Sequence, residues 1–288
     1  MQNKNKDFCI FILSHGRADN VHTFRTLKRM GCTYPIFFIV DNEDKTVDKY
    51  YKNFGKENVI VFDKLAISKT FDTGDNFDNR KTIVYARNAC FDIAEKLGYK
   101  YFLQLDDDYT AFEFRFDSQY KYVTDKIRKI NNIFPAMLEY FKSMSADSIA
   151  FAQGGDFIGG SESSSAKMRM KRKCMNTFFC STDKKFKFVG RINEDVNTYT
   201  SHASKGSLFL TVPNINIVQH QTQSNKGGMS EVYLDNGTYL KSFYSVMYSP
   251  NCVSISLMGN KEQRLHHRVS WNNAVPKILS ERHKKYEN

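Results

Sequence analysis

The sequence lacks the hallmarks of several classes of protein. Its six cysteines form no C-x-x-C pair, and no apolar run approaches the ~18 residues that a membrane-spanning helix needs. The polar start MQNKNKD does not resemble a signal peptide. We therefore expect a soluble, cytoplasmic protein whose thiols are reduced and buried, without a disulfide framework or a zinc site.

Motifs of several nucleic-acid proteins are missing as well. The sequence has no Gly-rich P-loop, no P-D…(D/E)-x-K nuclease pattern, no helix-turn-helix or zinc-finger pattern and no internal repeat. These absences count against a metal-dependent nucleotidyltransferase or nuclease and against a non-catalytic basic DNA-binding module. Both remain alternatives to the interpretation developed below.

Basic residues outnumber acidic ones by 42 to 31, which gives a formal net charge of +11. Such a charge attracts polyanions by long-range electrostatics and by counterion release. Nucleic acid is one such partner, but an anionic nucleotide substrate or a plainly solvated surface accounts for the same charge. The 24 phenylalanines and 16 tyrosines either fill the core or form surfaces on which bases and sugars stack.

The first hundred residues alternate strand signals with helix signals. Four apolar runs of strand length are Phe8–Leu13, Ile36–Val40, Val59–Phe62 and Tyr101–Leu105. Helices are expected between them at 21–30, with Asp19 or Asn20 as the N-cap, at Lys45–Phe54 and at Ile83–Leu97. This alternation predicts an α/β fold with a mostly parallel sheet covered by helices on both faces.

The remaining segments give less regular signals. Asp63–Thr82 has no clean periodicity, and loops of that length in a compact domain are usually functional, so we expect it to line a site. Thr124–Lys142 has helical periodicity, and Ser148–Ala152 is expected to be a strand. The length suits a single domain over 1–288, with an irregular C-terminal region.

Three consecutive carboxylates, Asp106, Asp107 and Asp108, directly follow the strand Tyr101–Leu105. In an open parallel sheet, ligands bind beyond the carboxyl ends of the strands. Packing three like charges together costs folding free energy unless a cation neutralises them, and Mg²⁺ or Mn²⁺ prefers such oxygen ligands and bridges them to a diphosphate. The alternative is an acidic turn that merely solvates the strand end.

The helix before this strand carries Tyr85-Ala86-Arg87-Asn88-Ala89, about twenty residues before the aspartates. An Ala-Arg-Asn helix, an apolar strand and an Asp-rich motif together resemble the GT-A glycosyltransferases. The resemblance implies a GT-A-type fold and a nucleotide sugar, UDP-sugar, as donor, bound by 1–110, with the acceptor bound by 111–288. It implies that Asp106 contacts the ribose and that Asp108 ligates Mn²⁺ or Mg²⁺.

The other donor-site residues that this resemblance implies are Ser14, His15, Gly16, Arg17, Asp41, Arg80, Arg87, Asn88 and Asp107. For Arg87 the alternative is a surface arginine paired with Asp92 or Glu95.

Two later segments extend the resemblance. Val189–Val196 looks like the Glu-Asp segment of inverting GT-A enzymes, which implies Asp195 as the general base and Glu194 as the second candidate. The alternative is a pair of surface acids at a helix start, where negative charge suits the helix dipole. His220, after the strand-like Ile215–Val218, would be a further metal ligand, and Lys226 would contact the diphosphate; a structural histidine is the alternative.

A narrower resemblance covers most of the first ~110 residues. The stretches ILSHGRADN, IVDNEDKT, SKTFDTGDNFDNRKTIVYARNAC and YFLQLDDD are similar to the TET/JBP-associated glycosyltransferases of phages, relatives of the base J glucosyltransferase. That resemblance implies a hydroxymethylated pyrimidine in DNA, hydroxymethylcytosine or hydroxymethyluracil, as acceptor, and a host-cell cytoplasmic location. A protein or glycan acceptor is the alternative within the same fold.

A basic run flanked by glycine and serine suits a DNA acceptor. Modifying a base in a duplex requires access to the major groove or a flipped-out nucleotide, held by contacts to phosphates. The expected DNA-binding residues are Lys167, Arg169, Lys171, Arg172 and Lys173. A solvated loop is the alternative.

Overall fold

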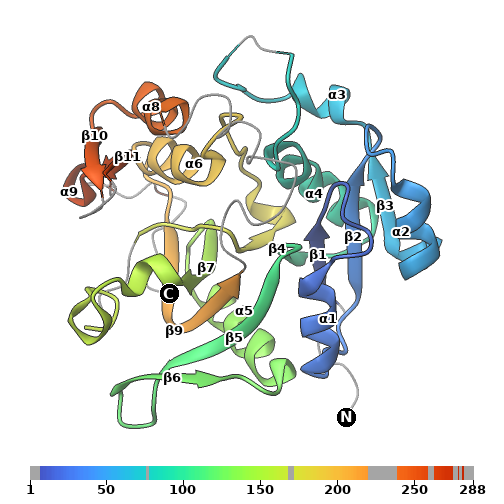
Figure 1. The fold of residues 1–288 in the computed structure, drawn as a ribbon, viewed down its shortest axis with the longest axis horizontal. Helices are drawn as coiled ribbons and strands as arrows, with labels where there is room; N and C mark the ends of the chain where they lie inside the picture. The colour runs from blue at the N-terminus through green and yellow to red at the C-terminus, as the bar shows by residue number, and fades with distance from the viewer. Residues whose placement is uncertain are drawn as a thin grey trace.

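The structure, a computed structural model, describes residues 7–75, 78–167, 172–219, 239–258 and 263–274, together with residues 278 and 281. In this part of the chain one nine-stranded sheet forms the centre, and a small two-stranded sheet lies beside α6 (Figure 1). No helix in the described ranges is long and apolar enough to cross a membrane.

The central sheet has the strand order β3-β2-β1-β4-β8-β7-β9-β5-β6. Neighbours pair in parallel from β3 to β4 and between β7 and β9, and the other four pairings are antiparallel. Among these nine strands only β5 and β8 therefore run against the rest, which confirms the predicted α/β fold with a mostly parallel sheet. The strands are β1 (Phe8–Leu13), β2 (Ile36–Asp41), β3 (Val59–Phe62), β4 (Tyr101–Asp106), β5 (Tyr109–Phe116), β6 (Tyr122–Lys126), β7 (Ser148–Gln153), β8 (Phe178–Ser181) and β9 (Phe209–Gln219).

Helices cover both faces of this sheet because its central strands are apolar on both sides. In β1, Phe8, Ile10 and Ile12 belong to one buried cluster, and the alternate residues belong to the other. The first cluster is covered by α1 (His22–Arg29), α2 (Val47–Phe54) and α5 (Ile133–Ser143). The second is covered by α3 (Lys64–Ser68), α4 (Val84–Lys96) and α6 (Glu194–Ala203).

The last described elements form a small unit that packs on α6. They are α8 (Tyr239–Tyr248), β10 (Val253–Met258), β11 (Arg264–Val269) and α9 (Trp271–Ala274). The Trp271 ring stacks on Tyr199 of α6 at a centroid distance of 5.9 Å. The Asn193 side chain, just before α6, donates to the Lys241 carbonyl at 2.8 Å. The unit therefore packs on α6 and is hydrogen-bonded to the residue before it.

Short 3-10 helices complete the described structure, at Lys56–Asn58, Ile130–Asn132, Gly154–Phe157, Gly160–Glu162 and Thr182–Lys184.

Three local predictions were wrong. Neither Asp19 nor Asn20 caps α1, because Val21 occupies the N-cap position and no side chain bonds to the helix start. The helix predicted from Thr124 begins only at Ile133, because residues up to Lys126 pair with β5 as strand β6. Asp63–Thr82 also contains a helix, α3, whose start Asp63 caps through a bond from the Ala66 amide.

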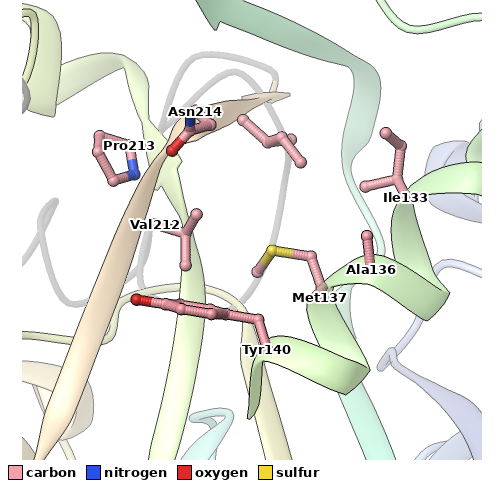
Figure 2. Close-up of a pocket in the computed structure, with 8 residues that line it drawn as sticks. Ile133, Ala136, Met137, Tyr140, Val212, Pro213 and Asn214 are labelled. Atoms are coloured by element: carbon pink, nitrogen blue, oxygen red, sulfur yellow. The ribbon is translucent and has the colours of Figure 1, made fainter. Parts of the chain in front are cut away.

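An apolar cavity of about 380 Å³ lies between α5 and β9 (Figure 2). Strand β9 bulges there, since Phe151 pairs with Val212 whereas Ala152 pairs with Asn216. Met137 and Tyr140 point from α5 toward Val212 across the opening. The cavity involves none of the predicted site residues, so the chemistry has to be sought at the strand ends.

Candidate active site

The predicted loop Ser14–Arg17 meets the aspartates at the carboxyl ends of β1 and β4. The Ser14 hydroxyl donates to Asp107 Oδ2 at 2.6 Å, and Arg17 Nη1 lies 2.9 Å from Asp107 Oδ1. Both carboxylate oxygens of Asp107 therefore have protein partners, and the side chain is buried. Asp107 thus anchors the loop, and its contact with the nucleotide stays a prediction.

Asp41 ends β2 within a fixed polar triad. His15 Nδ1 lies 2.6 Å from Asp41 Oδ2, and the buried Lys64 ammonium lies 3.2 Å from Oδ1. Burial raises the pKa of Asp41, but the hydrogen bond with His15 and the charge of Lys64 outweigh it and hold the pKa below its usual value. Asp41 is therefore ionised and oriented, and Lys64 is a partner that sequence analysis missed.

The neighbouring loop positions are also fixed. The Gly16 amide donates to Asp44 Oδ2 at 2.6 Å, with the glycine at φ +69°, a left-handed conformation that residues with a side chain disfavour. Arg80, on the segment after α3, contacts Glu43 at 2.7 Å and also pairs with Asp78. These contacts bring the segment that contains Arg80 to the end of β2.

Arg87 links two candidate carboxylates that lie far apart in sequence. Its Nη2 is 3.0 Å from Asp106 Oδ1 and its Nε donates to Glu194 Oε1 at 2.9 Å. The side chain is 1% exposed, and its guanidinium lies 4.8 Å from the centre of the Phe178 ring. Burial by itself would lower the pKa of Arg87, but the charges of Asp106 and Glu194 raise it, so the residue stays charged.

The surface alternative for Arg87 is therefore wrong. Asp92 and Glu95 pair instead with Lys185, at 3.3 and 2.7 Å. Within the described residues the Nη1 atom of Arg87 is buried without a hydrogen-bond partner. That donor is free to meet an acceptor atom that the described residues do not supply.

The carboxylates around Arg87 repel one another. Burial is the main cause that raises the pKa of Asp106 to about 7, and the charges of Asp108 and Glu194 raise it further while Arg87 opposes them. No group of three or more His, Cys, Asp or Glu side chains in the described part of the chain has the geometry of a metal site. The donor set is nevertheless oxygen-rich and mutually repulsive, which fits a hard divalent cation.

Glu194 and Asp195 occupy the first turn of α6 in different surroundings. Glu194 is held by Arg87, whereas Asp195 Oδ1 accepts a hydrogen bond from the amide of Val196 at 2.7 Å. Burial, followed by the neighbouring charge of Glu194, raises the pKa of Asp195 to about 6. A carboxylate with that pKa is still ionised near neutrality and is a stronger proton acceptor than an ordinary aspartate.

Asn88 has a structural position. Its amide nitrogen donates to the Phe188 carbonyl and its oxygen accepts from the Phe188 amide, both at 2.9 Å. The side chain is buried, so these two bonds hold the segment that leads to Glu194 and Asp195. The contact of Asn88 with the nucleotide stays a prediction.

The predicted DNA-binding run is only partly exposed. Lys173 is 7% exposed, and its ammonium lies 2.6 Å from the buried Asp156 carboxylate, so it is not available to phosphates. Lys167 is exposed but pairs with Glu162 at 2.9 Å, and Arg172 is exposed. Arg169 and Lys171 lie outside the described residues, as do His220 and Lys226.

A comparison with known families shows to which protein family the chain belongs. Residues 8–228 match the model described as TET-Associated Glycosyltransferase. The chain belongs to this family. No curated protein matches it.

Two solved structures are similar to this glycosyltransferase in fold. One is assigned as a nucleotide-diphospho-sugar transferase of Desulfovibrio desulfuricans G20, with 9% identity, a TM-score of 0.41 and coverage of 84% of this chain and 98% of the other. The second is glucosyl-3-phosphoglycerate synthase of Mycobacterium tuberculosis in complex with Mg²⁺ and UDP. It has 7% identity and a TM-score of 0.48, over 91% of this chain and 87% of the other.

The glycosyltransferase also carries a cluster of amides that sequence analysis missed. Asn176 Nδ2 donates to Gln153 Oε1 at 2.6 Å and to Gln219 Oε1 at 3.1 Å, at the ends of β7 and β9. Gln219 pairs across the sheet with Tyr109, the residue after Asp108. The three amides come from separate segments with no shared motif, so only the sheet order brings them beside the aspartates.

Proposed function

We propose that this nucleotide-sugar glycosyltransferase transfers a sugar from a UDP-sugar to the hydroxyl of a hydroxymethylated pyrimidine in phage DNA, with Mn²⁺ or Mg²⁺ at Asp108. The observation that carries the proposal is the buried Arg87, which ties Asp106 at the strand end to Glu194 beside Asp195. Donor-side and acceptor-side carboxylates thereby meet in one site. Residues 1–110 would hold the donor and 111–288 the acceptor.

Asp108 is the residue we assign to the metal, with His220 as a second ligand. The described strand β9 ends at Gln219, directly before His220, and Gln219 pairs with the residue that follows Asp108. A divalent cation there would neutralise the diphosphate as it leaves. Asp106 would contact the ribose, and Arg87 Nη1 and Lys226 would offer donors to the phosphates.

Asp195 is the residue we assign as general base. It takes the proton of the acceptor hydroxyl as that oxygen bonds to the anomeric carbon, and the bond from this carbon to the diphosphate oxygen breaks. The electron pair of that bond leaves with UDP. Because Arg87 holds Glu194, Asp195 is the neighbour better placed to accept a proton.

The acceptor is proposed to be DNA because the family is described as TET-associated and the chain carries a net charge of +11. The test incubates the protein with a panel of nucleotide sugars and with DNA containing hydroxymethylcytosine, hydroxymethyluracil or neither. Nucleoside mass spectrometry should show a hexose or pentose mass increment only on a hydroxymethylated base. Transfer to protein or glycan with unmodified nucleosides would overturn the DNA acceptor.

A further inference from the structure

Six exposed cations form a surface that the donor and catalytic sites do not use. All six side chains lie on α1 or on the segment that ends β6 and follows it, and we call this set the basic stripe: Arg25, Lys28, Arg29, Lys126, Arg128 and Lys129. Residues 20–33 and 126–133 contain no aspartate or glutamate. Among the described residues, no carboxylate forms an ion pair with any member of the stripe.

Direct hydrogen bonds join the two halves of the basic stripe. The Ile130 amide donates to the Met30 carbonyl at 3.2 Å, and Asn131 Nδ2 donates to the Gly31 carbonyl at 2.6 Å. Arg29 Nη2 donates to the Thr110 carbonyl at 2.9 Å, which places it over the start of β5. Helix α1 and strand β5 lie side by side in Figure 1. The two segments that carry the six charges are therefore bonded directly to each other.

The basic stripe begins at the candidate active site. Thr23, in the first turn of α1, donates through Oγ1 to the Asp106 carbonyl at 2.5 Å and through its amide to the Asp107 carbonyl at 3.1 Å. A helix rises about 1.5 Å per residue, so Arg29 lies roughly 9 Å along the axis from Thr23. That distance is about three base-pair rises of B-DNA, each about 3.4 Å.

The charges of the stripe differ from those of several other cations, which have carboxylate partners. Lys100, Lys185 and Arg191 each have a carboxylate within 2.7 Å. Unpaired cations at Arg25 and Lys28, close together on one helix face, repel each other unless an anion covers them. The phosphate backbone of nucleic acid supplies anions at this spacing.

We infer that the basic stripe binds the DNA backbone beside the base that is modified, in place of the run Lys167–Lys173. The inference rests on the proposed DNA acceptor and adds the surface that holds it, which extends the acceptor contacts beyond residues 111–288 to helix α1. Each phosphate contact releases counterions, so the logarithm of the affinity falls by about 0.9 per contact for each tenfold rise in salt.

The test measures fluorescence anisotropy of a labelled duplex with a hydroxymethylated pyrimidine over a range of salt concentrations. The variant Arg25→Gln/Lys28→Gln/Arg128→Gln/Lys129→Gln leaves Arg29, which bonds to Thr110, in place. We expect at least tenfold weaker binding at low salt, with the salt slope reduced by about 0.9 for each phosphate that the variant no longer binds. Unchanged UDP binding and unfolding midpoint would show that the fold and donor site are intact.

A matched control removes the same number of charges outside the stripe. Lys52, Lys69, Lys96 and Lys205 are exposed and have no carboxylate ion pair in the described ranges, so their fourfold glutamine variant should keep the wild-type slope. An unchanged slope in the stripe variant, or an equal reduction in the control, would overturn the inference. Preference for RNA or single-stranded DNA over the duplex would also overturn it.

The same experiment separates the inference from the proposed function. If the wild type binds DNA through the stripe but transfers no sugar to it, the acceptor proposal fails and the stripe stands. If the wild type glycosylates DNA and the stripe variant does so with an unchanged apparent KM, the stripe fails and the acceptor proposal stands.

Discussion

Two neighbouring carboxylates at the start of α6 have different partners although they share one turn of helix. Glu194 is tied to Arg87, while burial and the charge of Glu194 raise the pKa of Asp195 to about 6. The two residues differ because Glu194, and not Asp195, is hydrogen-bonded to Arg87 of α4. Glu194 is therefore held in place, whereas Asp195 can accept a proton.

Asp195→Asn tests the base. We expect kcat to fall by about 10²–10⁴ with little change in donor affinity, because only the proton acceptor is removed. Steady-state kinetics and UDP binding measure the two effects. A larger decrease in Glu194→Gln would assign the role to Glu194 instead.

The pH profile of the wild type tests the same residue independently. A base works only when deprotonated, so kcat/KM for the acceptor should rise with pH up to about 6 and then level off. Kinetics measured from about pH 5 to 8 should show this single acid limb. A profile that falls as pH rises through this range would contradict the assignment.

Asp108→Asn tests the metal. Removal of the carboxylate should abolish the Mn²⁺-dependent part of UDP binding, measured by calorimetry with and without the metal, and leave the circular dichroism spectrum unchanged. Asp48→Asn, at an exposed position on α2, is the control and should bind as the wild type does. Wild-type turnover in the Asp108 variant would contradict the assignment of the metal site to this residue.

At the scale of elements, backbone hydrogen bonds hold the turn before α6 against the segment that follows α3. The Gly190 amide donates to the Asp72 carbonyl and the Arg191 amide to the Thr73 carbonyl, both at 2.8 Å. Arg191 also pairs with Asp75 at 2.7 Å. The segment expected to line a site is thus bonded to the turn that precedes Glu194 and Asp195.

Gly190→Ala tests the close packing of this turn, and Gly98→Ala is the matched control. Both glycines have a positive φ, +81° and +77°, so each alanine costs about 1–2 kcal/mol of backbone strain. At Gly190 a Cβ would also lie 2.2 Å from Asn197 Nδ2, whereas nothing lies within 4 Å at Gly98. Urea unfolding should therefore show a destabilisation larger by about 1–3 kcal/mol at Gly190, and equal effects would contradict the close packing.

At the scale of the whole molecule, one sheet runs through both proposed halves. Strand β4 of the donor half pairs with β1 on one side and with β8 on the other. Arg87 adds a link between residues 107 positions apart. Donor binding is therefore expected to stabilise the entire described fold rather than one half.

A thermal unfolding experiment checks this expectation. With UDP and Mn²⁺ at about 100 times the dissociation constant, the free energy of unfolding should rise by about 2.7 kcal/mol, which moves Tm upward in a single transition. The Asp108→Asn variant should show no Mn²⁺-dependent shift. Two transitions, of which only one moves, would show that the halves unfold separately.

The sequence alone determined β1–β4 and the position of the aspartates. An apolar run such as Phe8–Leu13 is buried on both faces, so its pattern identifies a strand without knowledge of its neighbours. Asp106–Asp108 follow such a run, and the carboxyl end of a parallel strand is where ligands bind. Local periodicity was enough for both conclusions.

Only the tertiary structure decided what the polar residues do. Arg87 is buried by Phe178 and pairs with Glu194, Lys173 is buried against Asp156, and Asn88 bonds to Phe188. Each partner is supplied by a distant segment, and pairing between such segments leaves no trace in local periodicity. The sequence does not show whether a lysine or arginine forms an ion pair with a carboxylate. The basic stripe could therefore be identified only from the folded positions of the carboxylates.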